Sequence, residues 1–247
     1  MKRCSLNEYA FDIITEDSAY WIGFLMADGN VCYKTDVKGR GEHYIISLTL
    51  QAVDLDHLLN FQKFLGSSHR IHYRVNTKMK TFSYSLQFSS EKIAHALAQF
   101  GIVPKKSLIA KAISLECNVH FWRGVIDGDG TISVDPLGRP WIKLVGSLEL
   151  VSQFKEFLER NLDTNMPQVY RTGSIYRIVI TCNTCVRVVK LLYDNSTISL
   201  SRKLDRAQNI IQPRDIAYLR HEISRKRLNK EVLVLPLVFD PCKTRYY

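Results

Sequence analysis

The sequence predicts an α+β fold built from two pseudo-symmetric repeats, in which helices alternate with pairs of antiparallel strands. Two observations carry this prediction. A helix-like run ending in Asp-Gly occurs twice, as WIGFLMADGN at 21–30 and as WRGVIDGDGT at 122–131. The same order of expected elements follows each run: two strands, a helix, two strands and two more helices. We therefore expect the two halves of the chain to fold alike.

The expected elements come from alternating apolar residues in the strands and from helical spacing in the helices. In the first repeat, strands are expected at 30–35, 43–51, 69–75 and 81–89, and helices at 54–66, 90–101 and 102–113. In the second, strands are expected at 131–135, 140–146, 166–172 and 174–181, and helices at 147–161, 183–195 and 197–211. The join is expected near 103–118. The predicted parts are 1–115, 116–213 and a basic C-terminal extension at 214–247, which has no counterpart in the first half.

The composition indicates an intracellular protein that meets a polyanion. The chain has 247 residues, 46% of them hydrophobic, and a formal net charge of +10, which favours nucleic acid as the partner. No apolar run approaches the roughly 20 residues that span a bilayer, and the N-terminus lacks a signal-peptide core. The six cysteines are scattered, which indicates reduced thiols. Cys182 and Cys185 form a lone CxxC, interpreted as a strand end running into a helix rather than a zinc site.

The strands predict sheets with one apolar face and one polar face that carries few acids. At 69–75, Ile71, Tyr73 and Val75 alternate with basic side chains. The apolar faces are expected to pack on the helices. A solvated surface is the alternative for the polar faces, but it would mix in more Asp and Glu. We therefore expect the polar faces to lie against phosphates and base edges.

Each Asp-Gly run also places two small residues one helical turn apart. These pairs are Gly23 with Ala27 and Gly124 with Gly128. Small residues on one face let two helix backbones approach closely. We expect the two helices to pack side by side through these stripes, so that their C-termini meet.

The aspartates at the two helix ends predict a divalent cation. Asp28 and Asp129 would meet at two negative helix ends, where ionised carboxylates repel each other. A hard cation such as Mg²⁺ relieves this repulsion and prefers carboxylate and carbonyl oxygens. The glycine after each aspartate is expected to be left-handed, which would leave the last helix carbonyls free. Asp127, whose counterpart is Met26, is interpreted as a packing or hydrogen-bonding group. This layout suits metal-assisted phosphodiester hydrolysis.

The two runs resemble the signature of the LAGLIDADG family of homing endonucleases, with residues 21–29 as one copy and 122–130 as the other. The resemblance implies a monomer of two αββαββα repeats, packed through the signature helices, each with a curved four-stranded sheet that enters the DNA major groove. It implies that Asp28 with the Ala27 carbonyl, and Asp129 with the Gly128 carbonyl, bind Mg²⁺, for which Mn²⁺ or Ca²⁺ can substitute in binding. Each acid would serve cleavage of one strand of double-stranded DNA, leaving 3′ overhangs.

The family also uses a basic residue near the start of the last helix of each repeat. Lys106 and Lys203 match it, with Lys105 and Arg202 as their respective alternatives. A lysine there would stabilise charge on the phosphate or position the attacking water. Contact with phosphates alone is the other role open to these four residues.

Gln51 matches a polar position that holds water near the metal in the family. Aligning NFQKFL at 60–65 on QFKEFL at 153–158 pairs Gln51 with a position near Leu144. Leu144 is apolar, which predicts two unequal centres.

The residues expected to face DNA also differ between the repeats, which predicts a long, non-palindromic target. In the first repeat they are Asn30, Cys32, Lys34, His43, Ser47, Thr49, Arg70, His72, Arg74, Ser83, Ser85 and Gln87. In the second they are Thr131, Ser133, Asp135, Arg139, Trp141, Lys143, Tyr170, Thr172, Arg177 and Thr181.

Two other functions on the same fold stay open. One is an RNA maturase that assists intron splicing, for which the basic segment at 224–230 could contact RNA. The other is a sequence-specific DNA-binding regulator that does not cleave. The segment at 232–239 is expected to pack back on the body. Retention of both Asp28 and Asp129 favours the nuclease over either alternative.

Overall fold

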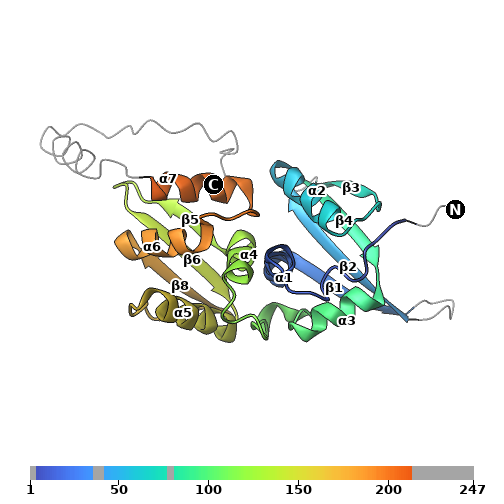
Figure 1. The fold of residues 1–247 in the computed structure, drawn as a ribbon, viewed down its shortest axis with the longest axis horizontal. Helices are drawn as coiled ribbons and strands as arrows, with labels where there is room; N and C mark the ends of the chain where they lie inside the picture. The colour runs from blue at the N-terminus through green and yellow to red at the C-terminus, as the bar shows by residue number, and fades with distance from the viewer. Residues whose placement is uncertain (1–3, 36–41, 77–80, 213–247) are drawn as a thin grey trace, which may run out of the picture.

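The computed structural model describes residues 4–35, 42–76 and 81–212 and shows two repeats side by side (Figure 1). The first repeat contains α1 (Glu16–Asp28), β1 (Gly29–Thr35), β2 (Glu42–Gln51), the 3-10 helix η1 (Ala52–Asp54), α2 (Leu55–Phe64), β3 (Ile71–Asn76), β4 (Thr81–Ser89), α3 (Glu91–Gln99) and the 3-10 helix η2 (Lys106–Leu108). The second contains α4 (Val119–Asp129), β5 (Thr131–Val134), β6 (Pro140–Gly146), α5 (Leu148–Leu162), β7 (Tyr170–Thr172), β8 (Ile175–Thr181), α6 (Cys182–Tyr193) and α7 (Ser201–Ile211). The predicted α+β fold of two αββαββα repeats is confirmed.

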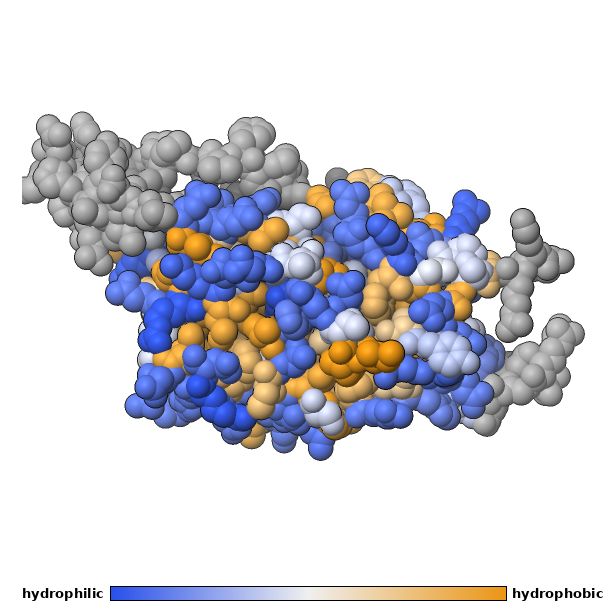
Figure 2. All heavy atoms as spheres, viewed as in Figure 1, coloured by the Kyte–Doolittle hydropathy of each residue, from blue (hydrophilic) through white to orange (hydrophobic). Residues whose placement is uncertain are grey.

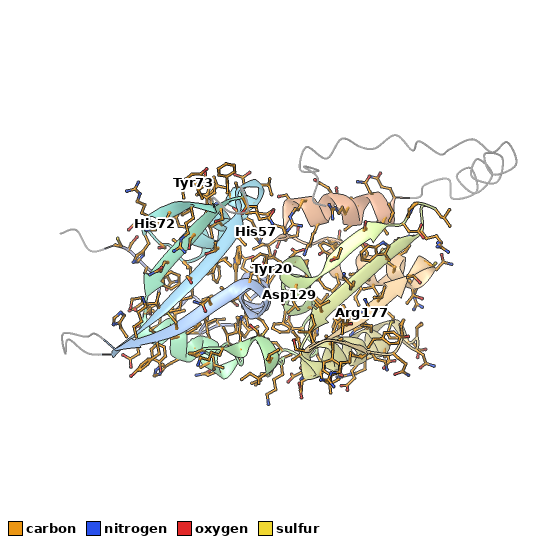
Figure 3. All side chains as sticks on the ribbon, turned by 180° about the vertical axis from the view of Figure 1, so that it is seen from behind. Tyr20, His57, His72, Tyr73, Asp129 and Arg177 are labelled. Carbon is orange, nitrogen blue, oxygen red and sulfur yellow. The ribbon has the colours of Figure 1, made fainter. Side chains whose placement is uncertain are left out.

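Each repeat forms a four-stranded antiparallel sheet, and the two sheets share one strand order. The orders are β1-β2-β4-β3 and β5-β6-β8-β7. Helices α2 and α3 pack on the first sheet, and α5 and α6 on the second. Figure 1 looks onto these helices, whereas Figure 3 looks onto the sheets from the other side. The polar sheet faces are thus the sides that the helices leave uncovered.

The centre of the molecule is the contact between α1 and α4, and the small-residue stripe explains it. A Cβ atom added at Gly23 would overlap the carbonyl of Phe121. One added at Gly124 would overlap the carbonyl of Tyr20. The two backbones therefore meet without intervening side chains, as the spacing of small residues predicts.

Aromatic residues join each central helix to the rest of its repeat. Trp21 of α1 lies 4.8 Å from Phe61 of α2, and Trp122 of α4 lies 5.3 Å from Phe154 of α5, measured between ring centroids. All four rings are buried. The two phenylalanines are the matching residues of NFQKFL and QFKEFL, so this sequence echo reflects one packing contact made twice.

The ends of the central helices differ from the prediction. Gly29 (φ −72°, ψ 147°) and Gly130 (φ −82°, ψ 163°) are extended rather than left-handed, because the chain runs directly into β1 and β5. A Cβ at Gly29 would lie 2.6 Å from the Leu25 carbonyl oxygen, and one at Gly130 2.5 Å from that of Ile126. These positions need glycine for close approach, not for a positive φ.

Two expected elements are shorter than predicted. The final helix expected at 102–113 is only the 3-10 helix η2, because Lys105 is left-handed (φ 61°) directly after Pro104 and interrupts the helix. The strand expected at 166–172 is only β7. The backbone N–H of Met166 donates to the Glu159 carboxylate at 2.9 Å instead of to a neighbouring strand.

No helix in the described ranges is long and apolar enough to cross a membrane. On the helix side, hydrophilic residues surround smaller hydrophobic areas (Figure 2).

Helix α6 starts at Cys182, directly after β8, which confirms the interpretation of the CxxC as a strand end running into a helix. The predictions for 224–230, 232–239 and Cys242 fall outside the described residues.

Candidate active site between the two repeats

The structure brings the two predicted acids to the same end of the central helix pair, between the two sheets (Figure 3 labels Asp129). The helices are close here too, since a Cβ at Gly128 would overlap the methyl group of Ala27. Burial raises the pKa of Asp129 to about 6, and the negative charge of Asp28 adds to the shift. Burial also raises the pKa of Asp28, opposed by the charges of nearby lysines and an arginine. Two carboxylates are therefore held where negative charge is unfavourable.

Lys106 closes the end of α1. Its side chain is buried, and its Nζ donates to the carbonyl oxygen of Gly29 at 2.7 Å and to that of Ala27 at 3.4 Å. Burial lowers the pKa of Lys106, while Asp129 and Asp28 raise it. The alternative residue, Lys105, is exposed. The geometry therefore selects Lys106 as the basic residue of this centre.

Lys203 closes the end of α4 with more contacts. Its Nζ donates to carbonyl oxygens of four residues of the helix end: Ile126 at 2.6 Å, Asp127 at 2.6 Å, Gly130 at 2.7 Å and Gly128 at 3.3 Å. Burial lowers the pKa of Lys203 to about 8, so it is still mainly protonated at neutral pH. Arg202, its alternative, is bound elsewhere. The prediction that the last helix carbonyls are free is wrong for Ile126 and Asp127, which Lys203 caps at short distance. The carbonyls of Ala27 and Gly128 make only long lysine contacts.

The Asp127 side chain is the centre of a buried network that crosses the repeats. Its oxygens accept from the Tyr20 hydroxyl at 2.7 Å, the Tyr193 hydroxyl at 2.6 Å and the backbone N–H of Leu200 at 2.7 Å. The Tyr20 hydroxyl is also 2.9 Å from Nε2 of His57, whose pKa burial lowers to about 3. Asp127 points away from Asp129 into the protein, as expected for a hydrogen-bonding group.

Gln51 is exposed at the end of β2, but the residue predicted to be its equivalent in the second repeat is wrong. Asn30 pairs with Ser47, and Thr131 with Lys143. Counting four residues on from Ser47 and from Lys143 makes Ser147, not Leu144, the equivalent of Gln51. The Ser147 side chain is buried and accepts from the backbone N–H of Leu150 at the start of α5 at 3.1 Å. The second centre therefore has no equivalent of the exposed glutamine.

The strand registers place the residues expected to face DNA on one face of each sheet, except for Arg70, Asp135 and Arg139, which lie just outside the strands. In the first sheet Thr49 pairs with Ser85 and Ser85 with His72; in the second Trp141 pairs with Thr181 and Val145 with Arg177. Most of the predicted residues are exposed or partly exposed: Asn30, Cys32, Lys34, His43, Ser47, Thr49, Arg70, His72, Arg74, Ser83, Gln87, Thr131, Ser133, Asp135, Arg139, Trp141, Lys143, Tyr170, Thr172, Arg177 and Thr181. Figure 3 shows His72 and Arg177 on opposite sheets.

Several of the predicted DNA contacts have partners within the protein. Ser85 is 1% exposed, and its hydroxyl accepts from that of Thr49 at 2.9 Å, so the prediction for Ser85 is wrong. Asp135 binds Nε of Arg139 at 2.7 Å across the β5–β6 turn. These two residues shape the turn as well as presenting charge at its tip.

A self-contained metal cage is absent from the described residues. No group of three or more His, Cys, Asp or Glu side chains lies close enough to hold an ion there. The central site offers only Asp28 and Asp129 with the nearby carbonyls. A hard cation bound there would need further oxygens from solvent or from a bound phosphate.

Comparison with known proteins identifies this architecture, although no protein-family model and no curated protein sequence matches the chain. The structure resembles I-SmaMI bound to an uncleaved DNA target in the presence of calcium ions, at 15% identity and a TM-score of 0.55, over 88% of this chain and 96% of that one. It also resembles the LAGLIDADG meganucleases I-AabMI (12%, 0.55, 89% and 99%) and I-CpaMI (14%, 0.54, 88% and 97%), both bound to uncleaved DNA. The chain has the LAGLIDADG meganuclease fold. At these identities the likeness concerns the fold.

Within the LAGLIDADG fold, the Tyr20–Asp127 hydrogen bond is a feature that sequence reasoning missed. Tyr20 stands where the second repeat has Phe121, and Asp127 stands where the first has Met26. At each of these two positions one repeat has a polar residue and the other an apolar one. The two polar residues, one from each repeat, bind each other. Comparing the two signature copies position by position would have supplied the signal.

Proposed function

We propose that the chain is a site-specific double-stranded DNA endonuclease. It hydrolyses one phosphodiester bond in each strand of a long, non-palindromic target with a divalent metal, and leaves 3′ overhangs. The observation that carries the proposal is the pair Asp28 and Asp129 at touching helix ends, between two sheets whose open faces are polar and basic. One chain supplies both acids and both sheets, so a monomer is sufficient.

The residues at the helix ends fit a divalent cation such as Mg²⁺. Two desolvated carboxylates with raised pKa values are an oxygen-donor pair that gains from a bound positive charge. Asp28 and Asp129 would hold the metal, with the carbonyls of Ala27 and Gly128 as further ligands. Those carbonyls make only long contacts to the lysines, at 3.4 and 3.3 Å. When bound, the metal would polarise the phosphate and favour ionisation of water.

The chain's own groups orient the phosphate and stabilise charge on it. Lys106 and Lys203 place buried ammonium groups next to the aspartates. Such preorganised positive charge favours a phosphate that gains negative charge during attack. Gln51 is positioned to hold a water molecule at the first centre only.

The open sheet faces would read the two halves of the target. Arg74 and His72 on β3 contrast with Thr172 and Tyr170 on β7, so unlike base edges would be recognised on the two sides. The excess of positive charge, +10 over the chain, supports binding through phosphates. Unlike faces predict a target without two-fold symmetry.

The test is cleavage of a randomised duplex-DNA library with Mg²⁺, beside Asp28→Asn and Asp129→Asn. We expect cut products with 3′ overhangs from the wild type. Each single variant should retain nicking of one strand at most, and the two variants should spare opposite strands. Specific binding without cutting under any divalent ion would contradict the nuclease and favour the maturase or the regulator. A selected target that is a perfect palindrome would contradict unequal readout by the two sheets.

A further inference from the structure

Arg202 of the second repeat is bound to the first repeat. Its Nε donates to Asp54, at 2.9 Å to one carboxylate oxygen and 3.2 Å to the other. The Asp54 side chain is 6% exposed, whereas that of Arg202 is 44% exposed. Asp54 directly precedes α2 but makes no side-chain capping bond to that helix, although aspartate is a favoured capping residue. Its carboxylate is turned to the arginine instead.

This ion pair lies beside the centre formed by Asp28. Asp54 ends η1, which starts directly after Gln51, and Arg202 is the neighbour of Lys203 in α7. Gly29, the residue after Asp28, pairs with Leu48 of β2, so Gln51 and η1 follow β2 at the end where α1 runs into β1. In keeping with this position, the charges of Arg202 and Asp54 both act on the Asp28 carboxyl. An arginine from the second repeat therefore stands at the centre of the first.

The guanidinium of Arg202 has N–H donors that the ion pair with Asp54 does not use. Within the described part of the chain, the hydrogen bonds of Arg202 use only its Nε. Its two terminal NH₂ groups are left for another acceptor, at a side chain that is almost half exposed. A planar guanidinium fixed along one edge presents two parallel N–H donors, which match two oxygens of a phosphate.

The other centre lacks such a group. Since Lys106 and Lys203 are equivalent, Lys105 is the counterpart of Arg202. Lys105 is exposed, is left-handed and takes part in no ion pair with the described residues. Ser147 follows β6 at the position that Gln51 has at the end of β2. Among its described residues, the second repeat has no 3-10 helix there and no acid equivalent to Asp54. The arrangement is therefore confined to the Asp28 side.

We propose that Arg202 is a phosphate-binding residue of the Asp28 centre, supplied by the opposite repeat and aimed by Asp54. The proposal rests on the endonuclease function proposed above and adds to it a residue used for one DNA strand only. Cleavage at the Asp28 centre then requires both repeats to be docked, since the acid and the arginine come from different halves.

The experiment measures the two strands separately. The duplex recovered from the cleavage selection carries a different fluorophore on each strand, and single-turnover rates are measured with Mg²⁺. Asp28→Asn first identifies the strand cut at the Asp28 centre. We expect Arg202→Ala to slow that strand by about 10-fold or more and to leave the other within about 3-fold. Arg202→Lys should slow it less, because the charge stays while the paired donors are lost.

The strand comparison separates phosphate binding from a structural role. Arg202 is adjacent to Lys203, so general disturbance of α7 would slow the strand cut at Asp129. Equal slowing of both strands, or slowing of the Asp129 strand alone, would overturn the proposal. Arg160→Ala removes the same charge from an ion pair with Glu156 on α5 and should leave both rates within about 2-fold.

Binding supplies a readout that does not need cleavage. The affinity of the same duplex is measured against salt concentration with Ca²⁺ in place of Mg²⁺. Loss of one phosphate contact in Arg202→Ala should lower the slope of log affinity against log salt by about one. A wild type that binds but cuts neither strand refutes the endonuclease, and an unchanged slope refutes the role of Arg202.

Discussion

The two repeats share one topology but close their central helices differently. At the end of α4, Lys203 reaches four carbonyl groups and is carried by α7, a helix of 11 residues. At the end of α1, Lys106 reaches two and is carried by the 3-residue η2. Asp127 accepts the backbone N–H of Leu200 just before α7, whereas Met26 offers no acceptor. The acid that ends the helix is kept in both repeats, and the residue two positions before it has diverged together with the element that it supports.

The largest expected difference between the repeats is in the free energy of unfolding, when Asp127 is replaced by the methionine found at the equivalent position of the first signature. Asp127→Met would leave two tyrosine hydroxyls and the Leu200 N–H without their buried acceptor. We expect a loss of about 3–5 kcal/mol in the free energy of unfolding, measured by urea denaturation. Met26→Leu, a volume-conserving control in the first signature, should cost less than about 1.5 kcal/mol. Similar losses in the two variants would show that the network adds nothing to ordinary packing.

The two lysines should differ in the same direction by a smaller amount. Lys203→Met removes an ammonium with four carbonyl partners, and we expect a loss of about 2–3 kcal/mol. Lys106→Met removes one with two partners and should cost about 1–2 kcal/mol. Both losses are read from denaturant midpoints at one pH, with m-values compared. A larger loss for Lys106 would reverse the proposed asymmetry.

The acids make the comparison pH-dependent. A carboxyl with a pKa of about 6 when folded and about 3.9 when unfolded binds more protons in the folded state between those values. Its contribution to stability is therefore complete below pH 4 and is lost as the pH rises through 6. Asp129→Asn should raise the stability of the metal-free protein by about 1–2 kcal/mol at pH 7.5 and leave it nearly unchanged at pH 4. Asp28→Asn should do less, because the charges of Lys203, Lys106 and Arg202 oppose the rise in the pKa of Asp28. Stabilisation that is independent of pH would rule out this cause.

The smallest difference concerns Gln51 and Ser147. Ser147→Ala removes the side-chain cap of α5 and should cost about 1 kcal/mol. Gln51→Ala should change stability by less than about 0.5 kcal/mol, since its side chain is exposed, yet slow cleavage of the strand cut at Asp28. Thermal unfolding and strand-specific rates test the pair together. A stability loss at Gln51 as large as that at Ser147 would remove the contrast.

Local spacing made much of this fold predictable. Small residues four positions apart indicated the α1–α4 contact, because backbone proximity depends on the residues of the helices themselves. The equivalence of Gln51 was harder to predict, since η1 inserts three residues between Gln51 and α2, whereas α5 follows Ser147 directly. Aligning the helices therefore shifted the strand by three positions.

Long-range contacts were the part that spacing could not supply. The capping of the carbonyls by Lys106 and Lys203 joins residues more than 70 positions apart. The Asp54–Arg202 pair spans 148 positions and crosses the repeats. Neither has a periodic signal, because each depends on how complete elements dock. Family resemblance indicates the two lysines as candidates, but their carbonyl partners depend on the folded structure.

The glycine contact between α1 and α4 has a consequence for how such a protein can change. Where backbone meets backbone, lengthening or trimming a side chain cannot slide one repeat along the other, so the separation of Asp28 and Asp129 is insensitive to substitution elsewhere. The open faces of the sheets carry no such constraint and can be rewritten one residue at a time. Under the proposed function, recognition would therefore diversify while the separation of the two acids stays constant. A hybrid that joined one repeat of this chain to a repeat of another protein with a matching stripe of small residues would keep the same separation of its two acids.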